Sequence, residues 1–195
     1  GDTRMTSKLK TDVLETVSGS GTIALTNQLS GMTSASVPSG SVLQVVSYFT
    51  AAKVSQTIGT TDTIVNSMTK AITPLGANSK FLVQVRWFGE INIVRNRVFN
   101  IHMDGARVNS PSNNYWSGLS VGSLSHDTAD GSTPEMVHLS TLVTTSSAVG
   151  TDITFSFVTS TYANNVIWSN RCFTNAGGSQ YENGTSELII TEIKG

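Results

Sequence analysis

The sequence predicts an all-β protein: an antiparallel β-sandwich of jelly-roll-like type with a short extended N-terminal segment. Three features of the composition predict it. Only 13% of the 195 residues are charged, whereas 53 residues are Ser or Thr. β-branched residues recur throughout the chain, and they suit the pleated faces of strands better than helices. Hydrophobic residues make up 38% of the chain, which favours a packed core over disorder.

Residues 1–39 are predicted to be an attachment or oligomerisation segment that ends in a linker. Its apolar clusters are short and are separated by Gly-Ser stretches such as residues 18–21. Such pieces cannot form a core alone, so they need a partner surface, which is the following domain, copies of themselves or a larger particle. The candidate docking residues are Leu9, Val13, Leu14, Ile23, Leu25 and Leu29.

Residues 40–195 are predicted to form the sandwich, because strand-like runs alternate there with turn residues. In residues 81–88 and 98–103, apolar side chains recur at every second position, which indicates strands rather than helices. Asp104-Gly105 then predicts a tight hairpin. The strand-like runs are 41–49, 81–88, 98–103, 106–108, 137–143, 153–157 and 186–193, with a further apolar region at 64–72.

Two long polar stretches, residues 109–134 and 169–184, are predicted to be surface loops, the first with one short strand. Long loops in compact domains are often functional. The first contains the candidate receptor-contact residues Asn113, Asn114, Tyr115 and Trp116, because aromatic faces bind sugar rings and anchor protein interfaces. The alternative is that these aromatic residues cap the core or a subunit contact. For Trp168, burial in the core is favoured.

The few ionisable residues predict no catalytic site, cofactor or metal site. The three histidines lack metal-ligand spacing, and the acidic residues of the first loop do not follow the order of an EF-hand loop. Nothing in the sequence brings Glu90 and Glu187 together as a glycosidase pair. The single cysteine, Cys172, is expected to be a buried inert thiol.

Charge and hydropathy limit the partners. A net charge of −1 without a basic stripe argues against nucleic-acid binding. No apolar run is long enough for a membrane helix, so no membrane insertion is expected. Four arginines cluster in the sequence around two strands, and they indicate either a small patch for anions or inter-subunit salt bridges: Arg86, Arg95, Arg97 and Arg107.

Several short motifs resemble tail-fibre and related virion proteins of bacteriophages, especially those of marine and cyanobacterial phages. They are residues 5–14 (MTSKLKTDVL), 18–27 (SGSGTIALTN), 40–46 (GSVLQVV), 72–74, 78–83, 103–105 and 184–193 (GTSELIITEI). Their order and spacing cover nearly the whole chain. The resemblance implies a segment that attaches to the particle and a projecting sandwich, usually a homotrimer, without catalytic residues.

Together, residues and resemblance predict a non-enzymatic virion protein, assembled in the host cytoplasm, that mediates attachment to a host-surface glycan or protein receptor. Other virion proteins are expected partners. Two alternatives remain open: a capsid decoration or vertex protein with a purely structural role, and, less favoured, a polysaccharide-degrading tailspike enzyme. The chain is short and poor in acidic residues for such an enzyme.

Overall fold

The computed structural model describes residues 37–91, 95–111, 116–124, 132–146, 148–174 and 181–195. The chain divides into two units, Gly1–Thr33 and Ser34–Gly195. The first unit lies outside the described residues, and so do the six predicted docking residues. The boundary of residues 1–39 and 40–195 therefore stays a prediction. The second unit contains all of the strands described below.

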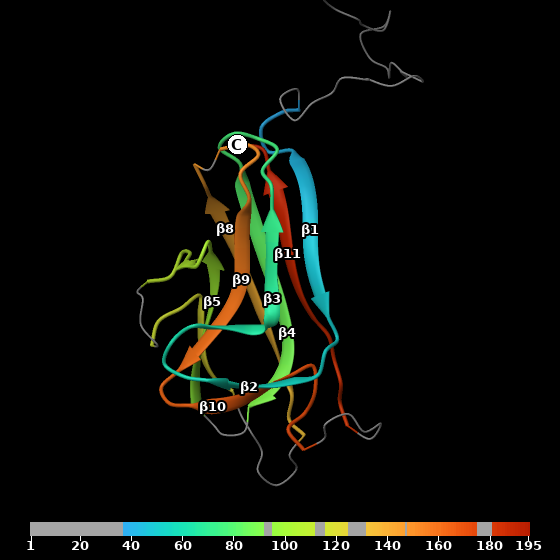
Figure 1. The fold of residues 1–195 in the computed structure, drawn as a ribbon, viewed down its shortest axis with the longest axis vertical. Helices are drawn as coiled ribbons and strands as arrows, with labels where there is room; N and C mark the ends of the chain where they lie inside the picture. The colour runs from blue at the N-terminus through green and yellow to red at the C-terminus, as the bar shows by residue number, and fades with distance from the viewer. Residues whose placement is uncertain (1–36, 92–94, 112–115, 125–131, 147, 175–180) are drawn as a thin grey trace, which may run out of the picture. The chain divides into compact units, whose positions relative to one another are not determined.

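The second unit is an antiparallel β-sandwich, which confirms the predicted fold class (Figure 1). One sheet, called sheet A here, has the order β1-β11-β4-β10-β2, with β8 on the other edge of β4. The other, sheet B, has the order β3-β9-β5-β6, with β7 also paired to β5. The strands are β1 (Val42–Thr50), β2 (Val54–Ile58), β3 (Thr63–Ile72), β4 (Lys80–Ile91), β5 (Arg95–Met103), β6 (Ala106–Arg107), β7 (Ser120–Leu124), β8 (Glu135–Thr144), β9 (Ile153–Thr161), β10 (Asn165–Ser169) and β11 (Ser186–Ile193).

The core lies between the two sheets and is built from alternate residues of the long strands. Aromatic rings from opposite sheets meet there: Phe81 of β4 and Phe155 of β9 have ring centroids 5.7 Å apart, and Trp87 and Phe99 have centroids 6.0 Å apart. The indole N–H of Trp87 donates to the Ser169 hydroxyl at 2.9 Å, so the buried ring leaves no unsatisfied donor.

The predicted hairpin at Asp104-Gly105 joins β5 to β6. Asp104 has a φ of 50° and Gly105 a φ of 82°, the two positive values that a type I′ turn requires. The Asp104 carboxylate also accepts a hydrogen bond from the backbone N–H of Thr154, which fixes the turn against β9. This short hairpin places Arg107 directly beside His102, its partner in the ladder.

Both ends of the sandwich domain lie at the same end of the sheets. The Gly40 N–H donates to the Lys194 carbonyl and the Lys194 N–H donates to the Ser41 carbonyl, so the start and the finish of the domain are paired. The connection between β9 and β10 lies at the opposite end (Figure 1). Any contact made near that connection is therefore remote from the place where the chain enters the domain.

Candidate functional site

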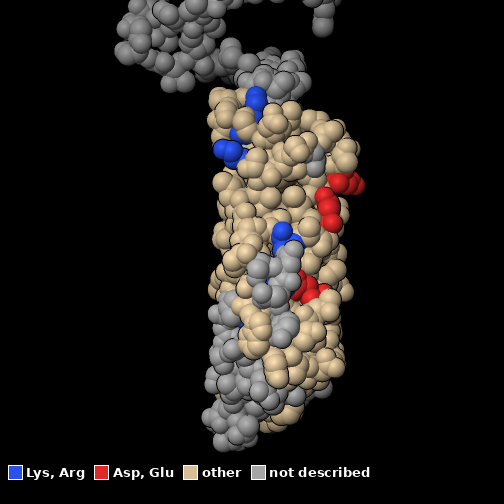
Figure 2. Space-filling model, turned by 90° about the vertical axis from the view of Figure 1, so that its left-hand side faces the viewer, with Lys and Arg blue, Asp and Glu red and all other residues tan. Residues whose placement is uncertain are grey.

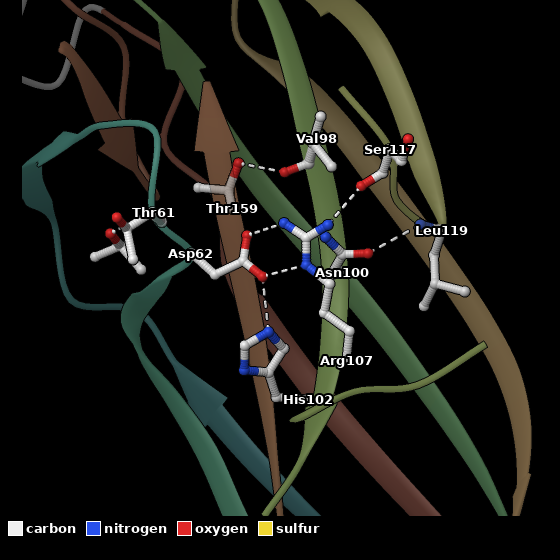
Figure 3. Close-up of polar contacts among 10 residues, drawn as sticks. Thr61, Asp62, Val98, Asn100, His102, Arg107, Ser117, Leu119 and Thr159 are labelled. Atoms are coloured by element: carbon white, nitrogen blue, oxygen red, sulfur yellow. Dashed lines mark hydrogen bonds and ion pairs between the residues drawn. The ribbon is translucent and has the colours of Figure 1, made fainter. Parts of the chain in front are cut away.

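A cluster of charged residues lies on the outer face of sheet B. Asp62 precedes β3, His102 is on β5 and Arg107 is on β6 (Figure 3). Arg107 donates from Nε to Asp62 Oδ2 at 2.5 Å and from Nη2 to Oδ1 at 2.6 Å, a bidentate pair. His102 Nε2 lies 2.8 Å from Asp62 Oδ2 and is the donor, since an ionised carboxylate only accepts.

This cluster is largely shielded from solvent: the Asp62 and Arg107 side chains are 10% and 8% exposed. Burial by itself raises the pKa of Asp62. The hydrogen bonds from His102 and Arg107, together with the charge of Arg107, outweigh burial and hold the pKa well below its usual range. Asp62 is therefore a carboxylate at all physiological pH values, and it links the approach to β3 with the β5–β6 hairpin.

The same cluster fixes the segment formed by residues 116–119 onto sheet B. Arg107 Nη1 donates to the Ser117 carbonyl at 2.8 Å, and the Leu119 N–H donates to Asn100 Oδ1 at 3.1 Å (Figure 3). Gly118 lies so close to the strand that a Cβ there would be 2.4 Å from Val98 Cγ1. The segment therefore lies flat against β5, and only a residue without a side chain fits at position 118.

Trp116 begins this segment, and its indole lies beside the ring of Tyr162, which follows β9. The two ring centroids are 5.7 Å apart and the planes are tilted by 31°. Trp116 is 49% exposed and Tyr162 is 54% exposed. The pair thus offers aromatic surface to solvent, while the backbone next to Trp116 is held by the Asp62–Arg107 pair. We call Trp116 and Tyr162 the aromatic pair.

The aromatic pair contains one of the four predicted receptor-contact residues. Trp116 is exposed rather than buried in the core, whereas Asn113, Asn114 and Tyr115 lie outside the described residues. Trp168 is buried, as favoured, and packs edge-on against Phe173 at 4.7 Å. Tyr162, Asp62 and the pairing of Arg107 were not predicted from the sequence. The only available signal was the return of Arg107 opposite His102 across the predicted hairpin.

The four arginines predicted as a group do not form one patch. Arg86 is on sheet A and donates from Nη2 to the Thr185 hydroxyl at 3.2 Å, whereas Arg107 pairs with Asp62 within the chain. Arg97 is buried in the sandwich, and the side chain of Arg95 is not among those that the structure describes. Arg107 is thus engaged in an ion pair within the chain, which neither the anion patch nor the inter-subunit salt bridges had predicted.

The outer face of sheet A carries a second feature, a shallow hollow of about 300 Å³. Polar and apolar residues of β4, β8 and β11 line it together: Gln84, Val85, Arg86, His138, Leu139, Ser140, Glu187 and Ile189. Around it, four large apolar side chains point to solvent: Val45, Phe49, Met136 and Leu142. Exposed apolar groups that share one sheet face are typical of a surface that contacts another protein.

Carboxylates and the cysteine serve structural roles in the described part of the chain. Glu90 is buried and accepts hydrogen bonds from the Thr133 N–H and hydroxyl and from the Phe173 N–H. Glu187 of β11 lies opposite Arg86, which comes four positions before Glu90 on β4, so the two glutamates are not neighbours in the ladder. Cys172 is buried, and burial raises the pKa of its thiol. Among the described residues, no group of three or more His, Cys, Asp or Glu is placed to hold a metal ion.

In the described ranges, no helix has the length and hydrophobicity that crossing a membrane requires.

No family model matches the sequence, and no curated protein matches it. Among solved structures, dimeric latent PorU from Porphyromonas gingivalis is similar with a TM-score of 0.37 and 10% sequence identity, over 79% of this chain and 14% of PorU. The chain therefore spans about one seventh of the length of PorU, and a likeness of this degree carries no argument about function.

Proposed function

We propose that this chain is a non-enzymatic receptor-binding component of a bacteriophage tail fibre, and that the aromatic pair is its contact site. The observation that carries the proposal is the pair itself: Trp116 and Tyr162 lie side by side, each about half exposed. Aromatic side chains with half-exposed faces are the usual anchors of protein interfaces and stack on sugar rings.

The support beneath Trp116 strengthens the proposal. Ordering flexible groups on binding costs free energy, and this cost is smaller for a site whose backbone is already fixed. Here Arg107 binds the carbonyl of Ser117, and Gly118 rests against Val98. The contact residue is therefore largely preorganised, even though it belongs to a connection between strands.

The place of the site in the domain is also consistent with attachment through one end. The chain enters and leaves the sandwich at one end, and the β9–β10 connection, which begins with Tyr162, lies at the other (Figure 1). A fibre component joined to its particle through the preceding residues would present the aromatic pair away from the junction. In a trimer, three weak sites would act together and gain avidity.

The surface composition suits recognition of a neutral ligand. Lys, Arg, Asp and Glu are sparse on the face shown in Figure 2, and residues of other kinds cover most of it. Recognition of a phosphate-rich polymer would need a run of basic residues. A host-surface glycan recognised through aromatic stacking and hydroxyl hydrogen bonds is the ligand class that we propose first, and a protein receptor is the second.

Binding of the full chain to host surfaces tests the proposal. The protein, coupled to beads so that many copies are presented, is applied to a glycan array and to a panel of cyanobacterial and marine bacterial cells. We expect binding that is lost in Trp116→Ala and in Tyr162→Ala, but kept in Leu142→Ala, which removes an equally exposed apolar side chain from sheet A. Absence of binding in every format, or equal binding by all variants, would contradict the assignment.

The apolar outer face of sheet A favours a second candidate, a capsid decoration or vertex protein with a structural role. There Val45 and Phe49 on β1 and Leu142 on β8 would pack against another virion protein. Electron microscopy of intact particles with a labelled chain separates the candidates by showing the label on the tail or on the capsid. A tailspike enzyme is the third candidate, and release of reducing ends from host polysaccharide would reveal it.

A further inference from the structure

Arg97 carries a guanidinium group into the interior of the sandwich. It lies on β5. Because side chains alternate between the two faces of a strand, Arg97 is on the same face as Phe99 and Ile101, which belong to the core, and Val98 is on the opposite face. Its side chain is 0% exposed. Its neighbours across the ladder are Thr161 of β9 and Gly122 of β7. The Arg97 side chain is therefore buried on the core-facing side of sheet B, beside Thr161, the last residue of β9.

The guanidinium of Arg97 has no acceptor in the described part of the molecule. Nε, Nη1 and Nη2 are all buried and none makes a hydrogen bond. The arginines whose side chains the structure describes elsewhere behave differently: Arg107 is in a bidentate pair with Asp62, Arg86 donates to the Thr185 hydroxyl, and Arg171 donates to the Cys172 carbonyl. Burial lowers the pKa of Arg97 to about 10, which leaves the group charged at neutral pH.

A buried charge without a partner is among the most destabilising features that a protein interior can contain. Arginine does not escape the cost by losing its proton near neutral pH. Five donors in a rigid planar fork also remain unused, and that fork matches two oxygens of a carboxylate or phosphate group. The arrangement is that of a binding group whose anion comes from outside the single chain.

We propose that Arg97 forms an internal anion site, which takes an oxyanion of the carboxylate, sulfate or phosphate class that the isolated chain does not supply. Two sources share this chemistry: an anion from solution that is bound as the domain folds, and a side-chain carboxylate of a second copy of the chain. The site is separate from the aromatic pair, and it would stabilise the assembled domain rather than recognise a receptor.

Thermal unfolding of the full chain tests the site. The unfolding midpoint is measured in chloride and then with acetate, sulfate or phosphate at constant ionic strength, for the wild type and for Arg97→Met. We expect the wild-type midpoint to rise and then level off as the site fills, by roughly 5–11 °C at a hundredfold excess over the Kd. Any rise in Arg97→Met should be smaller. The comparison is essential because sulfate and phosphate stabilise most folded proteins by exclusion. Arg86→Met is the matched control and should respond like the wild type.

A dilution series distinguishes the source of the anion. If a second copy supplies a carboxylate, the wild-type midpoint and the mass in solution rise with protein concentration, and Arg97→Met loses that dependence. Either response supports the site. Equal behaviour of the wild type and Arg97→Met toward every anion and every concentration would overturn it.

Should Arg97→Met fail to fold, nuclear magnetic resonance of the wild type decides. The Nε–H signal of Arg97 is followed while sulfate is added at constant ionic strength, and again on dilution. A saturating shift in either series supports the site, and a signal that is unchanged in both overturns it.

Discussion

At the scale of single residues, Asp62 has the widest influence on the candidate site. It accepts from Arg107 through both carboxylate oxygens and from His102, so three segments of sheet B depend on one charge. The carboxylate contacts no part of the aromatic pair directly. Its effect reaches Trp116 through Arg107 and the Ser117 carbonyl, which makes Asp62 a positioning residue.

Asp62→Asn should lower the free energy of unfolding by about 2 kcal/mol at pH 7, because Arg107 loses its charged bidentate partner. The pKa of Asp62 is lowered in the folded state, so its stabilisation is present above the unfolded value of about 3.9 and is lost as the pH falls toward the folded value. Urea unfolding from pH 7 to pH 3 measures both effects.

The difference between the wild type and Asp62→Asn should therefore stay constant above about pH 5 and shrink below pH 4. Asp152→Asn, at an exposed aspartate, is the control and should change the free energy of unfolding little at any pH. A difference that grows as the pH falls would show that the Asp62 carboxylate does not stabilise the fold.

Gly118→Ala should displace the segment that begins with Trp116. The added Cβ would lie 2.4 Å from Val98 Cγ1 and 2.9 Å from both Asn100 Oδ1 and the Phe99 carbonyl, all of which belong to a buried strand. Overpacking of this kind costs about 1–3 kcal/mol. Near-ultraviolet circular dichroism should lose the contribution of the aromatic pair.

The matched control is Ser117→Ala, because Arg107 binds the backbone carbonyl of that residue and not its side chain. Ser117→Ala should keep the dichroism and any binding to host surfaces. If Gly118→Ala retains both as well, the segment does not depend on its close contact with β5.

Residue-level predictions from sequence succeeded where the signal was local. Trp116 stood out as an aromatic residue in a polar stretch, and Cys172 and Trp168 were predicted to be buried and are. Tyr162 and Asp62 could not be found in this way, because their partners are 46 and 45 residues away in the chain, at Trp116 and Arg107. Only the pairing of β5 with β9 and β6 brings them together.

At the scale of strands, the period of two predicts β4, β5, β8 and β9, because one of their faces is buried, and the apolar run 186–193 predicts β11. β2 and β10 were not predicted. Each has only five residues, and they pair with one another at the end of sheet A, where the burial pattern of β10 is nearly continuous. A strand of five residues offers too few positions for a period to be recognised in the sequence, so periodicity cannot distinguish it from a loop.

The connection from β3 to β4 is tied to β11 by Glu192. This buried carboxylate accepts from the Leu75 and Gly76 N–H groups, at 2.9 and 3.0 Å, and from the Ser79 hydroxyl at 2.6 Å. It also accepts from Gln44 of β1 at 2.7 Å. Burial by itself raises the pKa of Glu192, but these hydrogen bonds outweigh it and lower the pKa.

Glu192→Gln should lower the unfolding midpoint by about 4–8 °C, because an amide nitrogen replaces one acceptor oxygen among several donors and about 2 kcal/mol is lost. Differential scanning calorimetry measures the shift. Glu187→Gln, at the half-buried glutamate of the same strand, is the control and should change the midpoint by less. Equal shifts in the two variants would contradict a special role for Glu192.

At the scale of the whole molecule, the apolar residues on the outer face of sheet A bear on assembly. If the chain forms the trimer that the fibre assignment implies, light scattering of the full chain should give three times its 20.7 kDa mass. Replacing both Val45 and Phe49 with Ser should reduce the mass toward that of a monomer if this face forms the contact.

Val149→Ser, at an equally exposed residue of the turn before β9, is the control and should leave the mass unchanged. A monomer in the wild type at all concentrations would contradict the trimer and would favour a protein that assembles only on the particle.

The position of β1 has a mechanical consequence. The chain enters β1 at the end of the sandwich where the domain also finishes, and β1 runs from there along β11 with antiparallel pairing from Val42 to Thr50 (Figure 1). A pull between the preceding residues and a contact at the far end would load β1 parallel to its own axis. The hydrogen bonds to β11 lie across that axis, so they would resist in shear together instead of opening one after another. In the proposed role of host attachment, the domain should therefore bear tension well between the particle and the receptor.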